Sequence, residues 1–196
     1  MRYLNDERQH QFWESDVAHL QQYVWPSGWP ERKPLVKILA WTLMPNHFHL
    51  LLQEIQDEGV SRFMQRLCGS MSRHFNEKYS EKGSLFQGAY RSRTVDTDEY
   101  LRWAIAYILV KNVFELYPGG FKKAVREFEK AWKWGTEVYQ FSSLRDYAQG
   151  KPSPIIDASF MKEIFTGPGD FKSCARDMIT SRLEEITEAS EGSVFE

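Results

Sequence analysis

The stretch AWTLMPNHFHLLLQ, residues 40–53, carries the clearest strand pattern in the chain. Residues 35–43 are mostly apolar and predict one strand, and residues 47–53 predict a second strand. Between them, Met44-Pro45-Asn46 has the composition of a tight connection. The stretch therefore predicts an antiparallel hairpin.

Two histidines occupy alternate positions at the start of the second predicted strand. Because side chains alternate along a strand, His47 and His49 share one face, with their rings roughly 6–7 Å apart along the strand. Such a pair can bind one metal ion if another element supplies further ligands. The alternative is a pair of surface or hydrogen-bonded histidines beside a turn, which this short pattern alone favours.

The rest of the chain alternates turn signals with helical periodicity. Helices are predicted at residues 16–24 with Ser15 or Asp16 as cap, and at 60–79, 98–115, 121–134, 142–149, 157–165 and 171–189. A short strand is predicted at residues 89–95, and only residues 1–4 are available for an opening strand. This order predicts an α+β fold with a small antiparallel sheet and helices on one face.

The predicted helix 60–79 has two kinds of side chain. Its apolar positions recur every four residues and are expected to face a core; they are Phe63, Leu67, Met71 and Phe75. Residues 62–93 contain seven Lys or Arg against two Glu, so 7 − 2 gives +5, whereas the whole chain has a net charge of −2. This window fits a phosphate-binding face, although charge alone favours an ordinary solvated helix face.

The predicted helix 98–115 carries a possible nucleophile. Tyr100 and Tyr107 are seven residues apart and so lie within about 20° of each other around the helix. Lys111 follows Tyr107 by one turn, and Arg102 is nearby in sequence. A tyrosine beside a cation can attack a phosphodiester, because the cation stabilises negative charge on the phenol oxygen and the phosphate. Spacing alone favours tyrosines packed at a core edge and does not choose between the two.

Composition restricts the class of protein. The chain has 196 residues, of which 42% are apolar and 15% aromatic, as expected for one globular domain with a small appendage. No apolar run approaches the ~18 residues of a membrane span, and the N-terminus lacks an apolar signal-peptide core. The two cysteines form no CxxC pair. We therefore expect a reduced, cytoplasmic protein with no membrane partner.

A run of motifs in order resembles a known family. The hairpin stretch is followed by Gly83-Ser-Leu-Phe-Gln-Gly88, Tyr90-Arg-Ser92 and Tyr107-Ile108. Together they resemble the HUH (His-hydrophobic-His) single-tyrosine transposases, which are the insertion-sequence-200-like transposases, and especially the REP-associated tyrosine transposases. The resemblance covers roughly residues 40–113. It implies a ferredoxin-like antiparallel sheet, the HUH endonuclease fold, in a catalytic domain at residues 1–120. A helical C-terminal extension with an acidic tail, expected to be disordered, would follow at 121–196.

The resemblance also implies a function for particular residues. His47 and His49 would bind Mg²⁺ or Mn²⁺, and Tyr107 would form a 5′-phosphotyrosine with single-stranded DNA beside a hairpin, leaving a free 3′-hydroxyl. The protein would act as a monomer or a homodimer. The residues expected to contact DNA are Arg66, Arg73, Phe86, Gln87, Tyr90, Arg91 and Arg93.

Three positions depart from the family pattern. Lys111 occupies the place of the amide that would be the third metal ligand, and Asn112 follows it. Asn112 is rotated about 100° from Lys111, so it can serve only if the helix loosens there; Lys111 would instead contact the scissile phosphate or steady the tyrosine. Ala89 replaces an arginine, and the opening strand is short. These departures leave open a nucleic-acid-binding protein of the same fold without the chemistry. A metal hydrolase with no covalent step is a further alternative.

Overall fold

The computed structural model describes residues 4–7, 30–151 and 153–192. Its contacts divide the chain into two compact units. The first unit contains Met1–Lys37 and Leu52–Thr94, and the second contains Ile38–Leu51 and Val95–Glu196. The predicted helix 16–24 and residues 1–3 of the predicted opening strand lie outside the described residues.

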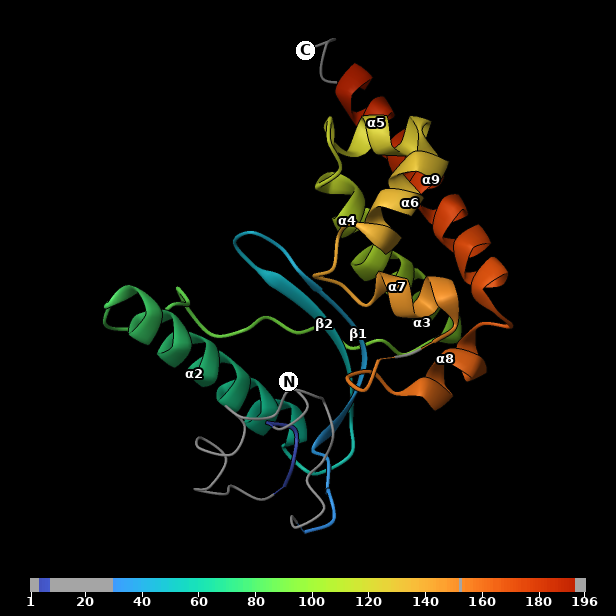
Figure 1. Cartoon of the computed structure of the whole chain (residues 1–196). Helices are drawn as coiled ribbons and strands as arrows, with labels where there is room; N and C mark the ends of the chain where they lie inside the picture. Colours follow the sequence, from blue (N-terminus) through green and yellow to red (C-terminus); the bar gives the residue numbers. More distant parts are fainter. Residues whose placement is uncertain (1–3, 8–29, 152, 193–196) are drawn as a thin grey trace. The chain divides into compact units, whose positions relative to one another are not determined.

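The predicted hairpin is present (Figure 1). Strand β1 covers Val36–Leu43 and strand β2 covers Phe48–Glu54, and the two form a sheet. The backbone N–H of Met44 donates to the carbonyl of His47 at 2.7 Å and closes the turn. Each strand begins one residue later than the sequence predicts. The second unit contains the turn, residues 38–43 of β1 and residues 48–51 of β2.

The larger sheet is not seen in the part of the chain that the structure describes, where the sheet has two strands. The strand predicted at residues 89–95 was wrong, because this segment has no regular structure. Its side chains are exposed up to position 94, so no apolar face fixes it against a neighbouring strand. One isolated antiparallel bridge, between Thr42 and Ser142, extends the pairing of β1.

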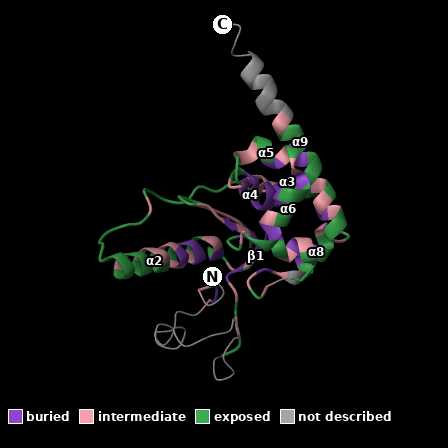
Figure 2. Cartoon of the chain, turned by 45° about the horizontal axis from the view of Figure 1, so that its top comes forward, coloured by how far each residue is buried: buried purple, intermediate pink, exposed green. Residues whose placement is uncertain are grey.

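The first unit is built on helix α2, Gly59–Tyr79. Phe63 and Leu67 are buried as the apolar stripe predicts, but Met71 is half-buried and Phe75 is 36% exposed. Figure 2 shows the change from buried to exposed side chains along this helix. The prediction of a continuous core-facing stripe therefore holds only for the first half of α2.

The start of β1 is fixed by a side chain near the N-terminus. The Asn5 amide donates to the carbonyl of Val36 at 2.7 Å and accepts from the backbone N–H groups of Leu35 and Val36 at 2.9 and 3.0 Å. Asn5 is 1% exposed. Its amide thus provides hydrogen bonds of the kind that a neighbouring strand would provide.

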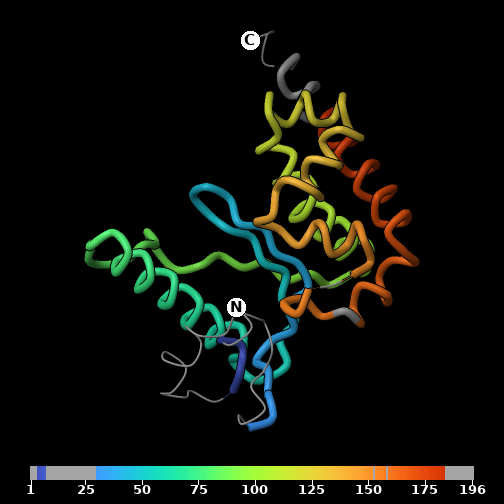
Figure 3. Tube along the Cα trace, in the orientation of Figure 1, coloured from blue at the N-terminus to red at the C-terminus, as the bar shows by residue number. Residues whose placement is uncertain are grey.

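After α2 the chain doubles back along the helix (Figure 3). We call residues 83–90 the strap. The Asn76 amide donates to the carbonyl of Gly83 at 2.8 Å, and the Tyr90 hydroxyl lies 3.2 Å from the Ser61 hydroxyl. These hydrogen bonds attach both ends of the strap to α2.

The second unit is mainly helical. Its helical segments are α3 (Asp98–Ala106), η1 (Tyr107–Lys111), α4 (Asn112–Glu115), α5 (Gly120–Arg126), α6 (Phe128–Glu137), α7 (Leu144–Gln149), α8 (Ala158–Ile164) and α9 (Pro168–Gly192). The first three follow without a break and match the helix predicted at 98–115. Thr97 caps α3 by accepting from the backbone N–H of Tyr100 at 3.2 Å. Segment η1 is a π-helix, which the sequence analysis did not predict.

The residues after position 120 are attached to β1 within the second unit. The Tyr147 hydroxyl donates to the carbonyl of Leu39 at 2.8 Å, and the backbone N–H of Ser143 donates to the carbonyl of Trp41 at 2.9 Å. The catalytic domain expected at residues 1–120 and the extension expected at 121–196 stay predictions.

Helix α9 is the last helix of the second unit and buries part of its surface. Its buried positions are Phe171, Ala175, Met178 and Ile179. The tail after position 186, expected to be disordered, is helical as far as Gly192, because its glutamates and alanine favour a helix. No helix in the described ranges is long and apolar enough to cross a bilayer.

Candidate active site

Two imidazole rings meet at the turn end of β2. His47 is exposed and lies just before the strand, whereas His49 is half-buried within it. Their ring centroids are 5.0 Å apart and the ring planes are inclined by 78°. His47 Nδ1 lies 2.6 Å from Asn46 Oδ1, and the tautomer that donates from Nδ1 to this oxygen leaves the Nε2 lone pair free.

The surroundings of His49 favour its neutral form. Burial lowers the pKa of His49, and the nearby His47 and Lys111 lower it further. Glu115 opposes this shift, but its effect is the smallest. A neutral imidazole has a lone pair for a metal ion or a hydrogen bond.

The structure brings Tyr107 beside this histidine pair. Its ring centroid lies 6.1 Å from that of His49, with an interplanar angle of 82°. Lys111 Nζ lies 3.4 Å from the Tyr107 hydroxyl and 4.8 Å from its ring centroid. Tyr100 instead stacks on Trp103, with centroids 6.0 Å apart. The geometry thus distinguishes the two tyrosines, which helical spacing could not.

A stacked aromatic column supports Tyr107 from the preceding turn. The rings of Trp103 and Tyr107 are 5.2 Å apart and inclined by only 19°. Tyr100 continues the column beyond Trp103, which is itself 40% exposed. Stacking between Trp103 and Tyr107 restricts the orientation of both rings. The column therefore limits the positions available to the Tyr107 hydroxyl.

Lys111 is held between a phenol and a carboxylate. Its Nζ lies 2.7 Å from Glu115 Oε1, and its side chain is only 14% exposed. This ion pair spans one helical turn. The ammonium group is thereby fixed beside the Tyr107 hydroxyl.

The helix widens into a π-helical turn directly before Asn112. In the π-helix η1 the backbone N–H of Asn112 donates to the carbonyl of Tyr107, five residues earlier. The buried Thr42 hydroxyl, on β1, donates to the carbonyl of Ile108 at 2.8 Å. This bond joins strand β1 to the π-helical turn and so stabilises it.

Asn112 has an incomplete set of hydrogen bonds. Its side chain is 1% exposed, and the buried Nδ2 has no hydrogen-bond partner. The wider turn that begins at Tyr107 ends at Asn112, so this amide belongs to the same turn as Lys111. A buried amide without a partner is costly unless a ligand completes it.

One of three comparisons with known proteins finds a match. The family model "Transposase IS200 like" matches residues 7–110, which is more than half of the chain. The chain belongs to the IS200-like transposase family. No curated protein and no solved structure matches it. The family indicates transposase-type activity, and hence a DNA-cleaving enzyme. The matched part includes both histidines and Tyr107 and ends one residue before Lys111.

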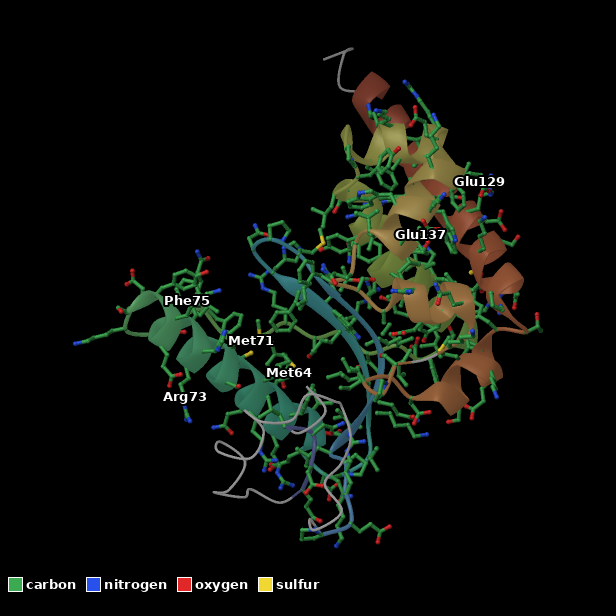
Figure 4. All side chains as sticks on the ribbon, in the orientation of Figure 1. Met64, Met71, Arg73, Phe75, Glu129 and Glu137 are labelled. Carbon is green, nitrogen blue, oxygen red and sulfur yellow. The ribbon has the colours of Figure 1, made fainter. Side chains whose placement is uncertain are left out.

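The DNA contacts predicted for this IS200-like transposase all fall in the first unit. Arg66 donates to the backbone carbonyls of Asp6 and Glu7, so it has a structural role in this conformation. Burial and the neighbouring Arg62 lower the pKa of Arg66. Arg73 is exposed, and Figure 4 shows it on the opposite side of α2 from Met71.

The other predicted contacts lie on or just after the strap. Phe86 and Tyr90 line a hollow against α2. The side chains of Gln87, Arg91 and Arg93 are exposed. They are accessible to a phosphate backbone, and their role in DNA binding stays a prediction.

Sequence reasoning missed three residues of this site. Glu115 could have been found from its spacing of four from Lys111, and Trp103 from its spacing of four from Tyr107. Thr42 gave no such signal, because its partner Ile108 lies 66 residues away in sequence. Arg102, noted near the tyrosines, instead pairs with Asp170 at 2.7 Å and joins α3 to α9.

Proposed function

We propose that this IS200-like transposase nicks and rejoins single-stranded DNA through a covalent bond to Tyr107. The observation that carries the proposal is the position of the Tyr107 ring between His49 and Lys111. Within the family we assign the chain to the REP-associated branch, on the motif run from the histidines to the tyrosine helix. We also assign the β1–β2 hairpin to a ferredoxin-like sheet of the HUH endonuclease fold.

The proposal includes a divalent metal, Mg²⁺ or Mn²⁺, at the histidine pair. In the described ranges no group of three His, Cys, Asp or Glu side chains could hold a metal ion, so the histidines need an amide or water as a further ligand. Two imidazoles with centroids 5.0 Å apart and the incompletely bonded Asn112 amide fit such a donor set. Rotation of that amide by half a turn would place its oxygen where Nδ2 now lies. When bound, the metal would orient the scissile phosphate and neutralise its developing charge.

Tyr107 supplies the nucleophile in this proposal. Its hydroxyl oxygen attacks the phosphorus in line, the bond from phosphorus to the 3′-oxygen breaks, and the phenol proton ends on the departing 3′-hydroxyl. The product is a 5′-phosphotyrosine. The 3′-hydroxyl of another strand then attacks the same phosphorus and releases Tyr107, so joining requires no nucleotide cofactor.

Lys111 and Glu115 provide the charge around this step. The Lys111 ammonium donates to the Tyr107 oxygen and stabilises negative charge on it and on the phosphate. Glu115 orients the ammonium through the 2.7 Å ion pair, which makes Glu115 a positioning residue. In this proposal Lys111 supplies a positive charge where the family pattern has a metal ligand. The π-turn lets Asn112, the next residue, act as the metal ligand instead.

The proposal is tested by trapping the covalent intermediate. Hairpin-flanked single-stranded oligonucleotides are incubated with the protein and Mg²⁺ or Mn²⁺, and DNA bound to protein is measured after SDS denaturation. Wild type and Tyr100→Phe should form the adduct, and Tyr107→Phe should form none. Tyr100→Phe is the matched control, because it removes the same hydroxyl from the same helix.

Two results would overturn the proposal. If wild type binds the oligonucleotides but forms no adduct on any of them, the protein is a nucleic-acid-binding member of the family without the chemistry. If Tyr107→Phe forms the adduct and Tyr100→Phe does not, the nucleophile is Tyr100. Size-exclusion chromatography of the protein with and without DNA distinguishes a monomer from a homodimer.

A further inference from the structure

The first unit contains a hollow of about 330 Å³ between α2 and the strap. Hydrogen bonds attach the strap to α2 on both sides of it. At one end the backbone N–H of Leu85 donates to the Ser72 hydroxyl at 3.4 Å, and at the other the Tyr90 hydroxyl lies 3.2 Å from that of Ser61. Hydrogen bonds thus join the strap to α2 on two sides of the hollow.

Two of the lining residues are glycines. Gly69 lies on α2 and Gly88 lies on the strap, and both line the hollow. A Cβ atom added to either would meet no heavy atom within 4 Å. Neither glycine has the positive φ that would require a glycine for backbone reasons. Both glycines therefore face open space, and a larger side chain can be placed at either without backbone strain.

The lining suits a flat, aromatic ligand with a polar edge. Phe86 and Tyr90 provide ring surfaces, and Met64 and Cys68 provide an apolar floor on α2. Burial raises the pKa of the Cys68 thiol, so this floor stays uncharged. Gln65 lines the same hollow, and its amide offers both a donor and an acceptor to the edge of a heterocycle.

We propose that this hollow is a pocket for one unpaired nucleobase of the DNA strand. Its volume is at the lower end of the about 300–1,000 Å³ range of small-molecule sites, as suits a single base. Aromatic side chains with an amide nearby are what proteins use to stack an unpaired base and read its edge. The inference rests on the proposed function, because it takes single-stranded DNA as the substrate.

Charge near the strap supports a nucleic-acid ligand over an uncharged one. Arg91 follows Tyr90 directly and Arg93 comes two residues later, and both side chains are exposed. A base in the hollow keeps its phosphates outside, where these arginines can neutralise them. The hollow would thus bind the base and the two arginines the phosphates of one nucleotide.

The test combines a variant whose pocket is filled with oligonucleotides that lack one base. Binding of a fluorescein-labelled, hairpin-flanked oligonucleotide is measured by anisotropy in EDTA, so that no strand is cut. Each unpaired base is replaced in turn by an abasic residue. For wild type, one abasic position should weaken binding about tenfold, as expected for loss of one stacked base. Gly69→Leu should bind the intact oligonucleotide about tenfold more weakly and be insensitive to that abasic position.

The matched control is Gly169→Leu. Gly169 lies in α9, does not line the hollow, and likewise has no atom within 4 Å of an added Cβ. This variant should bind like wild type and keep the same sensitivity to the abasic position. If Gly69→Leu fails to fold by circular dichroism, Phe86→Leu replaces it, and Phe86→Tyr should retain binding.

The outcomes separate this pocket from the proposed chemistry. If every variant binds like wild type, or if the abasic position weakens Gly69→Leu as much as wild type, the pocket does not bind a base. Adduct formation on the same oligonucleotide would then still support the proposed function. If wild type binds no oligonucleotide, both proposals fail.

A chemical footprint gives a second, independent readout. The chain has two cysteines, so Cys174→Ser leaves Cys68 as the single thiol. Saturating oligonucleotide should slow alkylation of Cys68 by a maleimide at least about fivefold, and the oligonucleotide with the abasic substitution should protect less. Equal alkylation rates with and without DNA would overturn the assignment.

Discussion

Helix α2 and the continuous helix α3–η1–α4 carry similar residue types but use them in opposite ways. Both contain aromatic rings and cationic side chains. In α2 the buried residues lie in the first three turns, and the rest of the helix is half-buried or exposed. In α3–η1–α4 the runs Ala104–Ala106, Ile108–Val110 and Asn112–Phe114 are buried, and Lys111 is fixed by Tyr107 and Glu115.

The difference in burial fits two different tasks, which are catalysis and DNA binding. Chemistry on a phosphate requires groups fixed to within a fraction of an ångström, and burial with defined hydrogen bonds provides this. Binding a flexible strand requires accessible charges and ring surfaces. Substitutions in α3–η1–α4 and in the strand that supports it should therefore affect stability and reaction rate. Substitutions in α2 and the strap should mainly affect affinity for DNA.

The largest effect is expected for the histidine pair. His49→Ala should lower the rate of adduct formation at least about 100-fold at saturating DNA, because it removes a proposed metal ligand. It should also weaken Mn²⁺ binding measured by calorimetry. His74→Ala, an exposed histidine on α2, should change neither. An unchanged Mn²⁺ affinity in His49→Ala would place the metal elsewhere.

The next effect concerns the π-turn. Thr42→Val keeps the shape of the side chain but removes the hydrogen bond to the carbonyl of Ile108. Urea denaturation should show a loss of about 1–3 kcal/mol, because a buried carbonyl loses its partner. Thr136→Val is the control, since Thr136 donates to helix carbonyls of Trp132 and Lys133, and its loss should be smaller. Equal losses would mean that Thr42 does not specifically stabilise η1.

A smaller effect is expected for the aromatic column. Trp103→Ala should slow adduct formation roughly tenfold, because the Tyr107 ring loses its stacked neighbour and samples more orientations. The dissociation constant for the oligonucleotide should stay the same, and Trp103→Phe should recover most of the rate. If Trp103→Ala weakens binding without slowing the reaction at saturation, Trp103 contacts DNA instead of positioning Tyr107.

The smallest effect is expected at the arginines after the strap. Arg91→Gln and Arg93→Gln should each reduce the slope of log affinity against log salt by about 0.7, the contribution of one phosphate contact with single-stranded DNA. The adduct rate at saturating DNA should not change. Arg66→Gln is the informative comparison, because its guanidinium already binds backbone carbonyls. It should lower stability and leave the salt slope unchanged.

Local sequence patterns predicted a large part of this fold. The hairpin was predictable because alternation and the Met-Pro-Asn turn act within a few residues of each other. The limits of the helix at 98–115 were predictable from the Thr97 cap and from the Tyr117-Pro-Gly-Gly stop. The strand predicted at 89–95 was wrong, because β-forming residues make a strand only where a neighbour pairs with them.

The candidate site likewise has features that local sequence predicts and features that it does not. Spacing alone placed the two histidines on one face and Lys111 one turn after Tyr107. It could not choose between the tyrosines, because that choice depends on which of them the fold brings to His49. Nor could it show that Arg66 binds the carbonyls of Asp6 and Glu7, about sixty residues before it.

The sequence by itself determined which groups are present and which neighbours along the chain share a face, because side-chain direction repeats every two residues in a strand and every 3.6 in a helix. The tertiary structure decided the rest. It loosened the helix at Tyr107–Lys111 and gave the carbonyl of Ile108 a partner in Thr42. The physical reason is that hydrogen bonds and packing between residues far apart in sequence can stabilise a π-turn that local propensities alone do not favour.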